Sequence, residues 1–313
     1  MLLAAWRRVL ARGLVVAALT LAVSCGNDDQ GPTIVVGAGN SMESNLLAQI
    51  YSGALSRTGV STSVAPHLGN RTDYFAALDA GTVAVLGEHT GELLTFLDAN
   101  SKARKPVAAT EVAADGVNRQ VPEPSVPDAV NRSLPEGLAV SDPADGTDMR
   151  PRMLLTEAAA TRDRVRSIGD LTARCAELEV GVAPVPEVLR APTATLRVSG
   201  CGFAGTKLFP DAAALRKALL DGEVQAGILG GPLALAPGAT NGLTVLSDDD
   251  YAFRAENVLA VYRKGDLGDR QIRKLNYVAG ELTTEDLVDM IGRIRDGAVP
   301  AEVARDWLDA HAL

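Results

Sequence analysis

A buried strand followed at once by an amphipathic helix constrains the fold of this chain most strongly. Thr33 to Gly37 (TIVVG) is a continuous apolar, β-branched run, the pattern of a strand covered on both faces. Asn40 can cap the next helix, Glu43 stands three residues on as in a capping box, and Gly59 ends the helix. A strand and a helix joined by a Gly-rich turn predict an α/β sheet that binds ligands at the carboxyl ends of its strands.

Two segments of similar pattern, Ala76 to His89 and Ala218 to Gly231, lie on either side of the middle of the chain. Each indicates a helix closed by Gly, a short apolar strand, and polar or Gly residues at the strand tip. Such units are common, so the likeness does not require a duplication. About 290 residues also exceed one comfortable core. We therefore expect two lobes, each with a small sheet whose strand tips face a shared cleft.

The turn-forming segments and expected elements of the rest of the chain fit two lobes. Val121 to Pro151 is rich in Pro, Asp and Gly, which predicts the crossing between the lobes. The other elements expected are strands at Met153–Thr156, Leu178–Val182 and Leu243–Leu246, helices capped by Asp211 and Thr283, and a strand at Asn257–Tyr262 that returns to the first lobe. Trp307, in the last helix, is expected in the core.

The first 24 residues have the pattern of an export signal. Arg7, Arg8 and Arg12 form a basic leader, and the apolar run that follows, residues 14–22, is too short for a stable membrane span. The end of the leader, LAVSC, resembles the lipobox of bacterial lipoproteins. That resemblance implies that Cys25 is acylated and becomes the first residue of a lipid-anchored protein. The alternative is an ordinary signal peptide with an incidental Cys.

Charge argues against two classes of partner. The formal net charge falls from −9 to −12 once the three Arg of the leader are removed. Such a chain lacks the basic patch that binds phosphate, so we expect no nucleic acid partner, and anionic headgroups would repel it. Contact with the membrane is therefore expected through the lipid anchor alone, with residues 25–32 as a polar tether.

Cys175 and Cys201 are the only other cysteines. In an exported chain an even pair predicts a disulfide, which would bridge the second lobe to itself. A metal site is a poor alternative because His67, His89 and His311 all lie far from both in sequence. A reactive thiol pair is also disfavoured, since the spacing is far from C-x-x-C. We expect no metal and no cofactor.

Motifs of catalysis are missing from the sequence. It contains no G-x-S-x-G elbow, Walker loop, H-E-x-x-H or EF-hand loop, and Gly37-Ala38-Gly39 lacks the rest of a dinucleotide fingerprint. Glu88 and His89 could form an acid–base pair, but nothing indicates a nucleophile. The sequence therefore predicts a protein that is not an enzyme.

Four segments carry a family resemblance. GAGNSMESNLLAQIYSGAL, residues 37–55, is similar to the G-S-K-N-F-T-E-Q opening of osmoprotectant-type substrate-binding proteins of ABC importers, which take glycine betaine, choline and carnitine. Residues 68–97 resemble their G-G-T-E segment with the later P-E-Y-T-G-T. Residues 142–156 resemble the crossover into the second lobe, and residues 248–265 resemble the returning segment with F-x-P-P-Y-N-x-A-P.

This resemblance implies the type II periplasmic-binding-protein fold, two α/β lobes that close on a small ligand. It places the first lobe at residues 33–147 and 251–313 and the second at 148–250. It also implies a monomer that works with a permease and an ATPase on the extracytoplasmic face of the cell membrane. Residues at matching positions give a predicted ligand set: Asn40, Ser41, Asn70, Arg71, Thr72, Glu88, His89, Thr90, Asp148, Arg150, Tyr251, Glu256 and Asn257.

Several of these residues have structural interpretations too. Asn40 and Glu88 could serve only as caps, Arg71 and Arg150 as solvated surface groups, and Asn257 as a backbone partner at the hinge.

The departures from the family pattern concern aromatic rings. The tyrosine of E-Y-T-G becomes His89, that of P-P-Y-N becomes Glu256, and that of Y-L-T-D-G becomes aliphatic near Ile228. Aromatic faces hold quaternary ammonium ions through cation–π attraction, and only 4% of this chain is aromatic. The pocket is therefore expected to suit a small polar or zwitterionic solute. An envelope lipoprotein that acts as a sensor or assembly partner without transport is the alternative function.

The anchor assignment predicts that a Cys25→Ala variant loses membrane retention, because the acyl chains supply the membrane affinity. Fractionation of cells into soluble and membrane pools measures this. A variant as firmly membrane-bound as the wild type contradicts the assignment.

Overall fold

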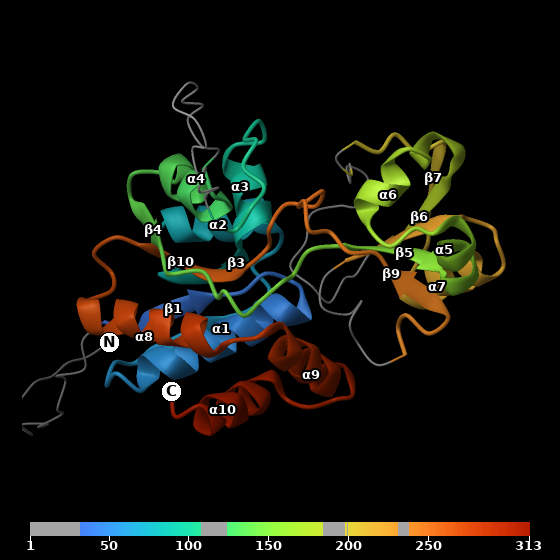
Figure 1. Ribbon diagram of the computed structural model, residues 1–313. Coiled ribbons are helices and arrows are strands. Elements are labelled where there is room, and N and C mark those ends of the chain that lie inside the picture. Colours follow the sequence, from blue (N-terminus) through green and yellow to red (C-terminus); the bar gives the residue numbers. More distant parts are fainter. Residues whose placement is uncertain (1–31, 108–123, 184–197, 199, 231–237) are drawn as a thin grey trace, which may run out of the picture.

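The computed structural model describes residues 32–107, 124–183, 198, 200–230 and 238–313, and these form two α/β lobes, each built on a five-stranded sheet (Figure 1). The leader and Cys25 lie outside the described residues, so their assignments stay predictions. Within the described ranges, no helix is both long and apolar enough to cross a membrane.

The sheet of the first lobe has the strand order β2-β1-β3-β10-β4. Its strands are β1 (Ile34–Gly37), β2 (Thr62–Ala65), β3 (Val85–His89), β4 (Leu138–Val140) and β10 (Val258–Arg263). Strand β1 is parallel to β2 and β3, whereas β10 is antiparallel to β3 and β4. The prediction that the chain returns to the first lobe at Asn257–Tyr262 is therefore confirmed.

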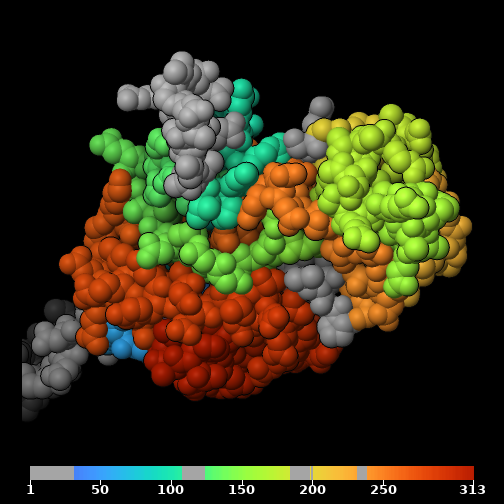
Figure 2. Space-filling model, viewed as in Figure 1, coloured from blue at the N-terminus to red at the C-terminus, as the bar shows by residue number. Residues whose placement is uncertain are grey.

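Both faces of this sheet are covered by helices. Alternate residues of β10 show it: Val258 and Ala260 belong to one hydrophobic cluster, and Leu259 and Val261 to another. The first cluster includes helices α1 (Met42–Ser56), α8 (Asp269–Glu281), α9 (Thr284–Arg295) and α10 (Pro300–Ala310); the second includes α2 (Arg71–Asp79), α3 (Thr90–Leu97) and α4 (Val126–Ser133). Figure 1 shows these two groups on opposite sides of the sheet, and in Figure 2 the C-terminal helices form most of the lower surface. This double cover explains the unbroken apolar run of β1.

The sheet of the second lobe has the order β7-β6-β8-β5-β9. Its strands are β5 (Arg152–Thr156), β6 (Glu179–Ala183), β7 (Gly205–Leu208), β8 (Ala226–Leu229) and β9 (Leu243–Val245), with β6 parallel to both neighbours. Around it lie α5 (Glu157–Asp163), α6 (Ile168–Thr172), η1 (Cys175–Glu177) and α7 (Ala212–Leu220). A disulfide joins Cys175 to Cys201, as the cysteine count predicts.

The paired helix–Gly–strand units occur as expected, one in each lobe. Helix α2 leads through Gly81 to β3, and α7 leads through Gly222 to β8. Both glycines have positive φ, 73° and 76°, a conformation that costs glycine little. The caps predicted at Asp211 and Thr283 are also present, and Trp307 is only 6% exposed, in the core.

Two expectations are corrected. The N-cap of α1 is Ser41, whose side chain accepts from the Ser44 N–H, and not Asn40. The exposed Asn40 stands one residue too early, and Glu43 makes a contact with another element instead of closing a capping box. The segment 121–151, predicted as the crossing, contains α4 and β4 of the first lobe, so the crossing begins after Val140.

The chain crosses between the sheets twice, after β4 and before β10, and the two crossing segments are hydrogen-bonded to each other. The Ala144 N–H donates to the Val258 carbonyl and the Met149 N–H donates to the Glu256 carbonyl. All strands of the first sheet lie within residues 33–147 and 251–313, and all strands of the second within 148–250. The domain bounds themselves stay a prediction.

The disulfide closes a loop over a sequence separation of 26, which stabilises a fold by about 3 to 4 kcal/mol in the chain-entropy account. A Cys175→Ser, Cys201→Ser variant should lose about this much free energy of unfolding, measured by urea denaturation. Reduction of the wild type should reproduce the loss and leave the double variant unchanged. A wild type that reduction does not destabilise would contradict this.

Candidate functional site

The candidate site lies at the carboxyl edge of the first sheet. Parallel strands β1 and β3 both end there, and β10 begins there because Val258 pairs with His89. The helices that follow β1, β2 and β3 therefore start at this edge, so the N-termini of α1, α2 and α3 share it. Helix N-termini carry partial positive charge and free N–H groups, which favour anionic or polar partners.

Local side chains cap the first two of these helices. At α1, Ser41 is the cap, and the Ser44 hydroxyl also accepts from the Gly39 N–H at 2.7 Å. At α2, Asn70 accepts from the Thr72 N–H and forms a capping box with Asp73. Ser41, Asn70 and Thr72 thus have structural roles at the edge where the sequence places them.

The third helix, α3, is capped from a distant part of the chain. Its N-cap residue, His89, makes no side-chain cap hydrogen bond. The Glu256 carboxylate, which lies in the second crossing segment, accepts from the N–H groups of Gly91 and Glu92 through Oε2, both at 3.0 Å. A Cβ at Gly91 would come within 2.6 Å of Glu256 Oε1 and 2.5 Å of the Ala255 carbonyl, so the segment rests directly on the glycine backbone.

A buried ion-pair cluster lies beside this cap. Arg71 donates to both oxygens of the fully buried Glu88 carboxylate, at 2.9 and 3.0 Å, and to Glu92 at 3.3 Å. The Tyr74 hydroxyl and the His89 N–H also donate to Glu88. Burial alone would lower the pKa of Arg71, but Glu88 outweighs it and raises the pKa, so the guanidinium stays charged. Arg71 is therefore a buried partner of Glu88, in contrast to the solvated surface interpretation.

His89 forms a second buried pair, with Glu43 on α1. His89 Nε2 lies 2.9 Å from Glu43 Oε1, and His89 is 3% exposed. Burial alone would lower the pKa of His89, but the Glu43 carboxylate, with smaller contributions from Glu256 and Glu88, raises it to about 9. The imidazole is thus held as a cation near neutral pH.

The hinge contributes the remaining residues. Asn257 Nδ2 donates to the carbonyls of Thr147 and Ala144 at 2.6 and 3.4 Å, which confirms the backbone pairing expected of Asn257. Its Oδ1 is buried without a hydrogen-bond partner in the described part of the chain. The Thr90 hydroxyl bridges the Ala255 carbonyl and the Asn257 N–H at 3.2 and 3.0 Å. These bonds fasten the start of β10 to the edge.

Arg150 connects the two crossing segments. Its guanidinium donates to Asp148 at 2.9 Å and to Asp248 at 3.2 Å, and lies 4.3 Å from the ring centroid of Tyr251. Asp248 in turn accepts from the N–H groups of Ala252 and Phe253. Burial alone would lower the pKa of Arg150, but Asp148 and Asp248 raise it. Asp148, Arg150 and Tyr251 therefore form a hinge cluster.

The structure brings the predicted residues together as one edge group and one hinge group. Four residues that no sequence motif indicated hold the predicted residues in place: Tyr74, Glu92, Thr147 and Asp248. The acidic run 248–250 was the available signal for Asp248. At the carboxyl edge of the second sheet, the segments that follow β6 and β8, 184–197 and 231–237, lie outside the described residues.

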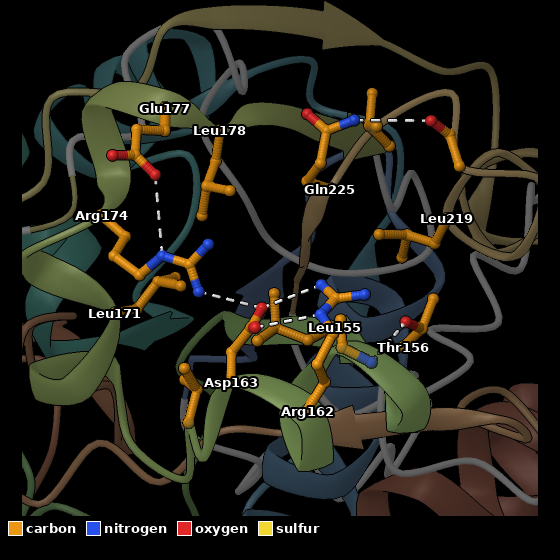
Figure 3. Close-up of a pocket in the computed structure, with 14 residues that line it drawn as sticks. Leu155, Thr156, Arg162, Asp163, Leu171, Arg174, Glu177, Leu178, Leu219 and Gln225 are labelled. Atoms are coloured by element: carbon orange, nitrogen blue, oxygen red, sulfur yellow. Dashed lines mark hydrogen bonds and ion pairs between the residues drawn. The ribbon is translucent and has the colours of Figure 1, made fainter.

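A cavity of about 380 Å³ lies at the other edge of the second sheet, where the parallel strands begin, and is separate from the candidate site (Figure 3). Leu155, Leu178 and Val224 line it where β5 ends and β6 and β8 begin. Its charged groups neutralise one another, because Asp163 pairs with both Arg162 and Arg174, at 2.9 and 3.0 Å, and Glu177 pairs with Arg174 at 3.7 Å. Within the described ranges, no group of His, Cys, Asp and Glu side chains could hold a metal ion.

Two sheets in two lobes, joined by a double crossing, define the type II periplasmic-binding-protein fold. The profile described as the substrate-binding domain of the ABC-type glycine betaine transport system matches residues 32–310, so the chain belongs to that family. This membership supports the resemblance seen in the sequence. Solute-binding proteins of this family are extracytoplasmic and are not enzymes. Among curated proteins, no sequence matches this chain.

Solved structures agree on the fold. A crystal structure of a glycine betaine/carnitine/choline ABC transporter protein is 17% identical, with a TM-score of 0.63 over 89% of this chain and 98% of that one. Apo YehZ from Escherichia coli is also 17% identical, with a TM-score of 0.60 over 90% and 99%. Lactococcal OpuAC, in a closed form with glycine betaine, is 15% identical, with a TM-score of 0.52 over 90% and 97%.

The buried groups predict a pH dependence of stability. The His89 pKa is raised from 6.5 to about 9, so its contribution is present below pH 6.5 and lost as the pH rises through about 9. It amounts to at most about 3 kcal/mol. The Glu256 pKa is raised from 4.5 to about 8, because burial and Glu92 disfavour its ionised form, so this carboxyl also favours the fold at lower pH. We expect the free energy of unfolding to fall between pH 6 and pH 9.

Urea denaturation at several pH values tests this, with His89→Gln as the matched variant, because a glutamine amide can still donate to Glu43 without titrating. The decline above pH 6.5 should be smaller in His89→Gln. Equal slopes in the two proteins would show that His89 is not the titrating group.

Proposed function

We propose that this protein is the lipid-anchored solute-binding protein of an osmoprotectant-type ABC importer, and that it delivers a small polar or zwitterionic solute to a permease and its ATPase. One observation carries the proposal: in a chain of this family, the predicted ligand residues gather where three helix N-termini meet the hinge. A solute held there would contact both the first lobe and the crossing segments, and its binding would favour lobe closure.

The same geometry supports a pocket that has diverged from an aromatic cage. The two positions where the family has tyrosines hold His89, paired with Glu43, and Glu256, which caps α3. Tyr74 is buried against Glu88, and Phe253 is 3% exposed in the core of the second lobe. One face of the Tyr251 ring is covered by the Arg150 guanidinium. No free aromatic face is therefore assigned to a quaternary ammonium ion among these residues.

A second function, a sensor or assembly lipoprotein without transport, is favoured by this same loss of rings. Genes for a permease and an ATPase beside this one would support import. Their absence from the neighbourhood would favour the alternative.

A thermal-shift screen of small solutes tests the proposal. A polar or zwitterionic solute at a hundredfold excess over its Kd should stabilise the protein by about 2.7 kcal/mol, whereas glycine betaine and choline should stabilise it weakly or not at all. Mass spectrometry of small molecules released from the purified protein gives an independent route to the ligand. If no solute in a broad screen shifts the melting temperature and none is released, solute binding is ruled out.

A further inference from the structure

One buried carboxylate at the candidate site lacks an ion-pair partner. Glu43, Glu88, Glu92 and Glu256 gather at the edge of the first sheet, where the nearby cations are Arg71, His89 and Arg254. Glu43 pairs with His89, and both Glu88 and Glu92 pair with Arg71. Within the described part of the chain, Glu256 forms no ion pair: two backbone N–H groups are its direct partners, and the charges of His89 and Arg71 act on it only from a distance.

The two oxygens of Glu256 differ. Oε2 accepts both backbone N–H groups of the α3 cap, whereas Oε1 accepts no hydrogen bond from any described residue. Glu256 is only 7% exposed as a residue, but Oε1 is not sealed from solvent, so a donor from outside can reach it. A cationic donor that reached Oε1 would form a strong, charge-assisted hydrogen bond.

Arg254, two residues earlier on the same segment, does not fill this role. Its guanidinium donates instead to the Ala103 and Ser101 carbonyls at 2.9 and 2.6 Å, and to the Thr95 hydroxyl at 2.7 Å. No described cation therefore contacts the Glu256 carboxylate directly, so a direct ion pair is open to a cation from outside the described chain.

We propose that Glu256 Oε1 selects a solute whose cationic centre carries N–H groups over its fully methylated analogue. This rests on the proposed function, because it assigns the solute to the same edge. A protonated amine donates directly to the carboxylate. A quaternary ammonium has no N–H, and its methyl groups keep the charge farther from the oxygen. The substitution of a ring by Glu256 would thus exchange a preference for methylated nitrogen for a preference for hydrogen-bonded nitrogen.

The electrostatic surroundings predict how this contact depends on pH. Burial and Glu92 raise the pKa of Glu256 to about 8, against the opposing effects of His89, the Glu92 N–H and Arg71. Arg254 is a further charged group on the same segment. A cation should bind better once Glu256 has lost its proton, so affinity should rise with pH up to about 8. His89, with a pKa of about 9, acts in the same direction only at higher pH.

The test uses glycine, N-methylglycine, N,N-dimethylglycine and glycine betaine, which keep one carboxylate and lose one N–H at each step. Isothermal titration calorimetry on the intact protein at pH 6, 7 and 8 measures their Kd. We expect affinity at least tenfold higher for N,N-dimethylglycine than for glycine betaine, since a hydrogen bond to a charged group contributes about a factor of ten or more. Binding of the N–H solutes should strengthen from pH 6 to pH 8.

Two matched variants locate the effect. Glu256→Gln removes the charge and should abolish both the N–H preference and the pH dependence between pH 6 and 8. Glu92→Gln removes a neighbouring carboxylate that already pairs with Arg71, and should keep the preference while moving the pH dependence to lower pH. Circular dichroism and melting temperature verify that both variants are folded.

Each outcome decides the inference. Equal or tighter binding of glycine betaine overturns it and leaves the proposed function standing. A preference unchanged in folded Glu256→Gln also overturns it. If none of the four solutes binds, the proposed contact between Glu256 and an N–H-bearing cation is wrong. Another solute found in the thermal-shift screen would still support the proposed function. If the screen is empty as well, the proposed function fails with it.

Discussion

Three buried carboxylates at one edge of a sheet constrain how the elements of the first lobe pack together. A buried charge is tolerated only when hydrogen bonds or an opposite charge replace the water that it loses. Glu43 and Glu88 meet this requirement through an imidazolium and a guanidinium fork, whereas Glu256 receives two backbone N–H groups at a helix start and keeps a raised pKa. The donors come from α2, α3 and β3, so the compensation of charge also fixes how these elements meet.

The hinge is built from the same kind of bond. Asn257, Thr90 and Thr147 fasten the beginning of β10 to both the edge and the first crossing segment. Arg150 then holds the two crossing segments together through Asp148 and Asp248. The residues expected to contact a solute are therefore also those that determine where the crossing segments lie. A ligand bound to them would act on the hinge without any intermediate element, as the proposed function requires.

Much of the fold could be predicted because local signals agree with the global arrangement. Some elements are indicated by residues that are adjacent in sequence. Examples are the β-branched run of β1, the caps at Asp211 and Thr283, and the Gly residues after α2 and α7. Local signals also explain the errors. Ser41 and Asn40 are both good caps, and the sequence does not decide between them. Glu43 fits a capping box, but a partner 46 residues away outcompetes that local role.

The site was less predictable for the same reason. Family resemblance located Glu88, His89 and Glu256, but their partners are set by contacts between elements far apart in sequence. Tyr74 approaches Glu88 only because α2 packs beside β3, and Glu256 reaches α3 only after the chain has crossed to the second lobe and returned. No periodicity or spacing encodes such contacts.

The cap on α3 places different constraints on two neighbouring positions of this chain. Glu256 binds α3 through main-chain N–H groups alone, so the side chain at position 92 is free to change without loss of the cap. Position 91 has no such freedom, because any Cβ there would push against the returning segment. A related chain with a larger residue at the position of Gly91 would have to move that segment outward, and its hinge would start from a different place. The place of the hinge in this chain thus depends on the absence of a side chain at a single position.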